Sequence, residues 1–245
     1  MTFDPHISFV GRYPPLDGTV EFYGRIGSLI DRDSTVLNLG AGRAAWYYVE
    51  KSKHRRQVLD LKSMTKRYIG ADIDAAVLSN PTTHENILVK NQQIPLNDSV
   101  CDLILSDFVL EHVEDVCSFE AEVFRLLKPG GWFCARTPHY FNYVSVAARL
   151  VSNLKHHRIL RYAQPDRLAE DVFPTCYRCN SLGALRHAFP APRWNNFSYL
   201  YTAEPSYYFG RPSIYKIMSV IHNHAPKIFT GNLFVFLEKT GLNQC

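Results

Sequence analysis

The chain has 245 residues, of which 46% are hydrophobic and 20% are charged. These proportions are typical of a globular protein and exclude a disordered or fibrous one, and the length suits one large domain or a domain with insertions. The formal net charge is only +4. Such a weak excess argues against a dedicated nucleic-acid-binding protein, so nucleic acid is not expected as a partner.

Several other classes of protein are disfavoured by local sequence. No apolar stretch is long enough to span a membrane, and the N-terminus has no apolar segment of signal-peptide length, so we expect a cytoplasmic protein. Cys176 and Cys179 form one C-x-x-C pair without a second pair at matching spacing, so no metal site is expected. The basic run over 51–56 is interpreted as a solvated surface, with contact to an anionic substrate as the alternative.

The first half of the chain alternates helix-like and strand-like segments. Apolar residues at helical spacing predict a helix over 19–31, and a β-prone run ending in glycines predicts a strand over 35–39. The segments that follow are predicted, in chain order, as a helix over 44–50, a strand over 68–71, a helix over 74–78 and a strand over 87–90.

The second half continues this alternation and then loses it. The predicted segments are a strand over 102–106, a helix over 118–128 ended by Pro-Gly-Gly, a strand over 132–136, helices over 181–188 and 213–224, and strands over 196–201 and 233–238. This order predicts an α/β fold with a doubly wound, mostly parallel, seven-stranded Rossmann-like sheet and helices on both faces. Residues 139–180 and 203–230 are interpreted as insertions that cover one end of the sheet as a lid.

A glycine turn follows the first predicted strand. Gly40-x-Gly42 lets the backbone turn tightly and approach a ligand closely, and the helix that follows offers free N–H groups to a polar or anionic group. With Ala45 the spacing also satisfies the dinucleotide pattern, so a nicotinamide-dependent enzyme is an alternative at this point.

A carboxylate follows the second predicted strand. Asp72 is placed to accept hydrogen bonds from both ribose hydroxyls of an adenosine ligand, whereas Asp74 is interpreted as a helix cap. The alternative is that both residues only cap the next helix. The interval from Gly42 to Asp72 exceeds the usual spacing, and the basic run over 51–56 accounts for the surplus as a local insertion.

A third group of motifs separates these alternatives. It consists of Ile94-Pro-Leu, Asp102-Leu-Ile-Leu-Ser-Asp-Phe-Val-Leu-Glu-His-Val113 and Arg125-Leu-Leu-Lys-Pro-Gly-Gly131. Together with the first two motifs, it closely resembles the class I S-adenosylmethionine-dependent methyltransferases of the small-molecule "LEHV…LKPGG" type. The resemblance covers roughly residues 34–138. Nicotinamide enzymes do not share these blocks.

The resemblance implies S-adenosylmethionine as the cofactor and assigns roles to residues near the glycine turn. Gly40, Ala41 and Gly42 would pass under its methionine part, Asp72 would hold the ribose, and Ile73 would pack on the adenine. Further residues follow later strands: Ile94 or its neighbours would flank the other adenine face, and Ser106 and Asp107 would border the methionine end.

Two positions depart from the family pattern. Asn38 stands where the family usually has an acidic residue, which removes the charge that would favour the amino group of the cofactor. Lys90, Asn91 and Gln92 occupy a stretch where an aspartate often accepts from the adenine amino group. Asn91 or Gln92 can accept through a side-chain oxygen. Both losses keep a non-catalytic, cofactor-sensing relative as an alternative.

Two histidines are candidate general bases, because methyl transfer to a hydroxyl requires the removal of a proton. His112 follows the fourth strand and His139 follows the fifth, at the edge where open α/β sheets bind ligands. The alternative for each is a purely local structural role.

The acceptor pocket is expected under the insertions. The candidate lining residues are Tyr140, Phe141, Tyr143, Phe173, Tyr177 and Arg178, although such aromatics can also simply fill the core of a lid. We expect methyl transfer to a small or medium organic acceptor, at oxygen, of a sugar, lipid-linked or natural-product type. RNA methylation and cofactor sensing are the rivals, and the oligomeric state is left open.

Overall fold

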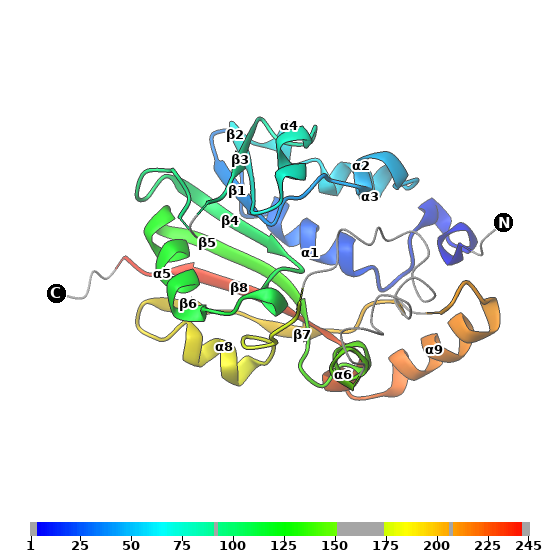
Figure 1. The fold of residues 1–245 in the computed structure, drawn as a ribbon. Coiled ribbons are helices and arrows are strands. Elements are labelled where there is room, and N and C mark those ends of the chain that lie inside the picture. Colours follow the sequence, from blue (N-terminus) through cyan, green and yellow to red (C-terminus); the bar gives the residue numbers. More distant parts are fainter. Residues whose placement is uncertain (1–3, 91–92, 151–173, 206–207, 242–245) are drawn as a thin grey trace.

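The structure is a computed structural model that describes residues 4–90, 93–150, 174–205 and 208–241 (Figure 1). Its centre is an eight-stranded mixed sheet. The strands are β1 (Thr35–Leu39), β2 (Arg67–Asp72), β3 (Glu85–Leu88), β4 (Cys101–Asp107), β5 (Leu127–Pro138), β6 (Trp194–Asn196), β7 (Tyr199–Tyr201) and β8 (Asn232–Lys239).

The strand order confirms the predicted doubly wound, mostly parallel sheet. The path runs β3-β2-β1-β4-β5-β8-β6, with β7 pairing beside β8. The first five strands of the path are parallel, and β8 is antiparallel to β5. Because the parallel strands point the same way, their carboxyl ends form one edge of the sheet, which we call the carboxyl edge.

The strand predicted over 196–201 is two strands, β6 and β7, and this raises the number from seven to eight. Both pair with β8 in antiparallel register. The Asn196 side chain accepts a hydrogen bond of 2.9 Å from the Ser198 N–H, and the Ser198 hydroxyl accepts one from the Phe236 N–H at 3.1 Å. The Phe197 N–H still donates to the carbonyl oxygen of Phe236 at 2.9 Å, so these side-chain bonds interrupt the strand at Ser198.

Helices cover both faces of the sheet. On one face lie α1 (Gly18–Gly27), α3 (Lys53–Leu59) and α4 (Leu61–Met64), whose buried side chains share a core with the strand residues Val36, Leu103 and Leu105. On the other face lie α5 (Val116–Leu126) and α8 (Leu182–Ala188), which pack in a second core with Leu37 and Ile104. The alternation of strand residues between the two cores explains their continuous apolar runs.

Several helices differ from the prediction in length. The predicted helix over 44–50 is a single turn, α2 (Trp46–Val49), and the helix over 74–78 is a 3-10 helix, η3 (Ala75–Ser79). Helix α5 begins after its N-cap Asp115 and ends at Leu126, because β5 already starts at Leu127, which pairs with Cys101. The Pro-Gly-Gly segment that we expected to stop the helix therefore lies within β5.

The remaining elements gather beyond the carboxyl edge (Figure 1). They are η1 (Pro5–Ser8), η2 (Val10–Arg12), η4 (Leu110–His112), α6 (Tyr143–Leu150), α9 (Pro212–His224) and α10 (Lys227–Thr230). The predicted insertions contain α6, α9 and α10, but residues 151–173 lie outside the described part, so the domain boundaries stay a prediction. Among the described residues, no helix is both long and apolar enough to cross a bilayer.

Candidate functional site

The glycine turn after β1 is held directly against the end of β2. The Gly40 N–H donates to the carbonyl oxygen of Ala71 at 2.8 Å, and the Gly42 N–H donates to Asp72 Oδ2 at 2.8 Å. Gly40 has a φ of +78°, and a Cβ added there would overlap the side chain of Val109. Only glycine satisfies both conditions, because it tolerates the left-handed region and occupies no space beyond its Cα.

The Asp72 carboxylate keeps capacity for a ligand. Its Oδ1 accepts from the Asp74 N–H at 2.9 Å, and its Oδ2 accepts from Gly42. A carboxylate offers roughly four lone-pair sites, so these two bonds among the described residues leave room for a pair of hydroxyls. Asp74 in turn accepts from the Ala76 N–H at 2.8 Å, which confirms that it caps η3.

Asn80 is a part of this site that the sequence did not reveal. Its side-chain amide donates to the carbonyl oxygens of Ala41 at 3.1 Å and Gly42 at 3.0 Å. Asn80 is buried, and its own Oδ1 accepts from Thr82. The glycine turn is thus fixed from both sides. No local pattern signalled this contact, because the partners lie 38 and 39 residues apart.

The residues expected around an adenine divide into three groups. Ile73 follows Asp72 and is 68% exposed, so its side chain is open to a planar ligand. Ile94 is buried in the core that contains α5, and its N–H donates to Glu122 at 3.0 Å. Asn91 and Gln92 lie outside the described residues.

Asn38 lies on β1 two residues before the turn. Its side-chain amide donates to the Tyr68 hydroxyl at 3.1 Å. Burial raises the pKa of Tyr68, so this hydroxyl stays protonated at neutral pH. Asn38 stands at the position where the family resemblance expects a carboxylate, and its partner, the Tyr68 hydroxyl, is neutral.

Ser106 and Asp107 are the last two residues of β4. The first is enclosed by the protein, and the second is paired with an arginine. Ser106 is fully buried. Both carboxylate oxygens of Asp107 bind the Arg136 guanidinium at 2.7 Å, and Oδ2 also accepts from the Tyr23 hydroxyl at 3.1 Å. Burial and the Asp107 charge raise the pKa of Tyr23, so it remains a donor. A contact from Asp107 to the methionine end stays a prediction.

Arg136 organises this part of the carboxyl edge, and the sequence did not single it out. Its guanidinium lies over the rings of Phe22 at 5.4 Å, Tyr23 at 5.9 Å and Phe108 at 4.8 Å. Planar guanidinium groups combine stacking with bidentate pairing to a carboxylate. The pair with Asp107 could have been found only from the register of β4 and β5, in which these two residues are direct neighbours.

The two candidate bases lie at the same edge, after neighbouring strands. His139 Nδ1 lies 2.9 Å from the carbonyl oxygen of Ile228, and His112 Nδ1 lies 2.7 Å from that of Pro174. A carbonyl oxygen only accepts, so we assign the proton to Nδ1 in both rings, which leaves the lone pair on Nε2. In His139 the Phe141 N–H also approaches Nδ1, at 3.3 Å, and would need Nδ1 as an acceptor. We give precedence to the shorter contact with Ile228. Burial lowers the pKa of His139, which keeps its ring neutral at pH 7.

The structure brings together some of the candidate acceptor residues. The Arg149 guanidinium lies 3.8 Å from the centre of the Tyr140 ring and 5.9 Å from that of Tyr177. Tyr143 instead packs its ring against His222, at 5.5 Å. Tyr177 is buried, Arg178 is exposed, and Phe173 lies outside the described residues.

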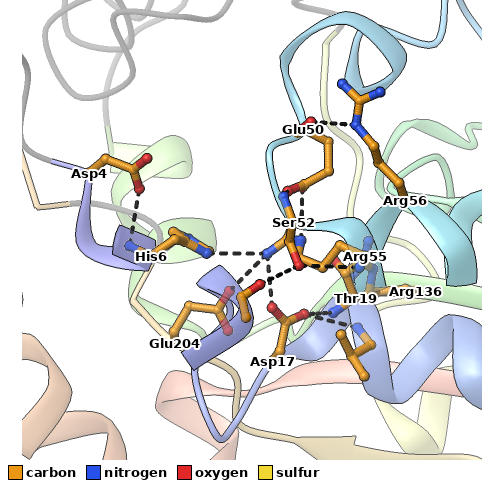
Figure 2. A network of polar contacts seen from close by, with 12 residues as sticks. Asp4, His6, Asp17, Thr19, Glu50, Ser52, Arg55, Arg56, Arg136 and Glu204 are labelled. Carbon is orange, nitrogen blue, oxygen red and sulfur yellow. Dashed lines mark hydrogen bonds and ion pairs between the residues drawn. The ribbon is translucent and has the colours of Figure 1, made fainter. Parts of the chain in front are cut away.

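A polar network beside this edge joins the N-terminal segment to the rest of the molecule (Figure 2). Arg55 on α3 pairs with Asp17 at 2.9 Å, Glu50 at 2.9 Å and Glu204 at 3.9 Å. Its side chain is only 16% exposed. The expectation of a solvated basic run was therefore wrong for Arg55, because it is surrounded by the nearby Glu50 and by two carboxylates that are distant in sequence.

Comparison with known proteins identifies the same core. Residues 54–135 match a family model described as a methyltransferase domain. A probable S-adenosylmethionine-dependent methyltransferase of Mycolicibacterium smegmatis is 30% identical over 118 residues, which are 45% of this chain and 44% of that protein. The dimethylglycine N-methyltransferase of Parasynechococcus marenigrum is 28% identical over 127 residues, 50% of this chain and 44% of that protein. The matched segment thus spans less than half of each relative.

A solved structure has the same fold over most of the chain. The geranyl diphosphate C-methyltransferase of Streptomyces coelicolor superimposes with a TM-score of 0.56, at 15% identity, over 90% of this chain and 75% of that one. It was solved with S-adenosyl-L-homocysteine. The family match begins after the glycine turn and covers β2, β3, β4, α5 and most of β5. Together with the strand order, it identifies residues 54–135 as part of a class I methyltransferase domain.

Proposed function

We propose that this protein transfers the methyl group of S-adenosylmethionine to an oxygen atom of a small or medium organic acceptor, of a sugar, lipid-linked or natural-product type. One observation carries the proposal. The glycine turn is bound to the Asp72 carboxylate, which keeps lone pairs for a ribose diol beside an exposed Ile73. This donor set fits an adenosyl group.

The residues of this chain have distinct tasks in binding the cofactor. The peptide over Gly40–Gly42 would pass under the methionine part, Asp72 would accept from the ribose hydroxyls, and Ile73 would pack on the adenine. Asn38 would lie near the methionine amino group, and Asn91 or Gln92 would accept from the adenine amino group. Ser106 and Asp107 would border the methionine end.

The chemistry divides between the cofactor and the protein. The bound sulfonium supplies an activated methyl group with a good leaving group. The protein aligns the acceptor, excludes water and removes a proton from the acceptor hydroxyl. His139 is our first candidate for the proton acceptor, because burial keeps its ring neutral and Nδ1 is already bonded to a carbonyl. His112 is the second candidate.

Aromatic rings and a cation favour a polar organic acceptor. Tyr140, Tyr177 and Arg149 form one cluster after β5, and rings combined with a guanidinium suit both the faces and the hydroxyls of such a molecule. Tyr143, Phe173 and Arg178 remain candidate contacts. The relatives named above methylate nitrogen in one case and carbon in another, so the reacting atom must be tested directly.

Calorimetry with S-adenosylmethionine, followed by turnover assays, tests this proposal. We expect binding, and then methyl transfer to members of a panel of hydroxylated acceptors. A failure to bind would refute the cofactor site. Binding without turnover on any hydroxylated, amine or carbon acceptor would favour a sensor. Transfer to bulk RNA that falls steeply with salt would favour the RNA rival.

A further inference from the structure

Helix α9 buries Tyr215 and His222 and, unlike an ordinary surface helix, also exposes a row of branched aliphatic side chains. Ile217, Val220 and Ile221 are 61%, 59% and 44% exposed, and their spacing places them on one face of the helix. Its inward side includes the buried His222, whose Nδ1 hydrogen-bonds to the carbonyl oxygen of Ala203 at 2.8 Å. A helix that buries a polar ring and exposes branched aliphatic residues is suited to contact with an apolar medium.

Exposed apolar side chains recur on the next helix of the chain and beside it. Ile228 and Phe229 on α10 are exposed, and so is Phe141. His139 connects them, because its Nδ1 bonds to the Ile228 carbonyl and its ring lies 6.0 Å from that of Phe141. We call this set the outer patch: Phe141, Ile217, Val220, Ile221, Ile228 and Phe229.

The stretch of chain that carries α9 and α10 has charges of one sign. No aspartate or glutamate stands between Glu204 and Glu238, whereas Lys216 and Lys227 lie within this stretch and are exposed. Arg149, on the adjoining helix α6, is exposed as well. An apolar patch flanked by cations complements a surface that is apolar inside and anionic at its boundary.

We propose that the outer patch and its flanking lysines bind the surface of an anionic phospholipid membrane. The aliphatic and aromatic side chains enter the boundary between headgroups and acyl chains, and Lys216 and Lys227 contact the headgroup phosphates. A second copy of the chain is a poorer occupant, because a symmetric interface would set these lysines near their own copies. This binding is peripheral, and it goes beyond the proposed methyl transfer.

Vesicle co-sedimentation with the full chain, without methyl donor, tests the proposal. We expect the protein to sediment with vesicles of phosphatidylcholine and phosphatidylglycerol, less with phosphatidylcholine alone, and less at high salt. Val220→Asp should weaken binding roughly tenfold, since a charge replaces an exposed valine that the membrane would otherwise bury. The matched control is Val10→Asp, because Val10 is 97% exposed outside the patch, and it should bind as the wild type does.

A second pair of variants tests the charges. Lys216→Gln should weaken binding to anionic vesicles about fivefold, whereas Lys66→Gln, at an exposed lysine after α4, should not. Absence of sedimentation with either vesicle, or equal loss in Val220→Asp and Val10→Asp, would overturn the proposal. So would a dimer in sedimentation velocity that Val220→Asp dissociates, since the patch would then be covered by protein. These readouts involve no methyl transfer, so they fail or succeed separately from the proposed function.

Discussion

The Asp72 carboxylate accepts a hydrogen bond of 2.8 Å from the Gly42 N–H, across 30 residues of sequence. This bond joins the turn after β1 to the end of β2, where the two halves of an adenosyl ligand would meet. The same carboxylate accepts from the Asp74 N–H, so its orientation is fixed before any ligand arrives. Such preorganisation reduces the entropic cost of binding.

Replacing Asp72 with alanine should weaken S-adenosylmethionine binding about tenfold or more, because hydrogen bonds to a charged group are lost. Calorimetry on the purified variant measures this. Asp74→Ala is the matched control, since Asp74 only caps η3, and its affinity should stay near that of the wild type. Unchanged affinity in Asp72→Ala would show that the ribose is held elsewhere.

Gly40→Ala and Gly130→Ala form a second matched pair. The two glycines have φ values of +78° and +77°, but only Gly40 faces a side chain, that of Val109. Gly130→Ala should therefore cost about 1 kcal/mol of stability from backbone strain alone. Gly40→Ala should cost about 1–3 kcal/mol more through overpacking, and Val109→Ala should restore part of it. Denaturant unfolding measures all three changes, and equal losses in the two glycine variants would contradict this account.

The base assignment predicts a pH dependence. The pKa of His139 is lowered by burial, so the neutral, proton-accepting ring persists below the ordinary pKa of 6.5 and is lost as the pH falls through its lowered value. His139→Gln should reduce methyl transfer to a hydroxyl about a hundredfold or more and remove this acidic limb, with cofactor affinity unchanged. His112→Gln, measured in the same assay, decides between the two histidines. A wild-type pH profile in His139→Gln would exclude His139.

The buried Glu204 carboxyl predicts that the stability of the protein changes with pH. Burial, with a smaller contribution from the Asp17 carboxylate, raises its pKa from 4.5 to about 7. A group whose pKa is higher in the folded state contributes stability below pH 4.5 and loses it as the pH rises through about 7. Glu204→Gln should therefore gain stability relative to the wild type over this range, by about 3 kcal/mol at most.

Unfolding in urea at several pH values measures the Glu204 effect. Glu114→Gln is the control, because Glu114 is exposed and its replacement should leave the pH dependence unchanged. Parallel curves for the wild type and Glu204→Gln would show that Arg55, which lies 3.9 Å from Glu204, keeps this carboxyl ionised.

Much of the fold followed from local pattern. Apolar runs, glycine turns and caps set the order of strands and helices, and this order with right-handed crossovers determines a doubly wound sheet. The predicted element boundaries were wrong in two places. Asn196 accepts from the Ser198 N–H and so divides β6 from β7, and Leu127 pairs with Cys101 and so ends α5 early.

The sequence by itself determined the family, the sheet and the position of Asp72 after β2, because each depends on residues close together in the chain or on motifs in a fixed order. Only the tertiary structure decided the partners of Arg136, Arg55 and Asn80. Their energies come from desolvated charges and amides whose counterparts lie tens of residues away. Burial and pairing of that kind depend on how the strands and helices assemble, and no local pattern carries that information.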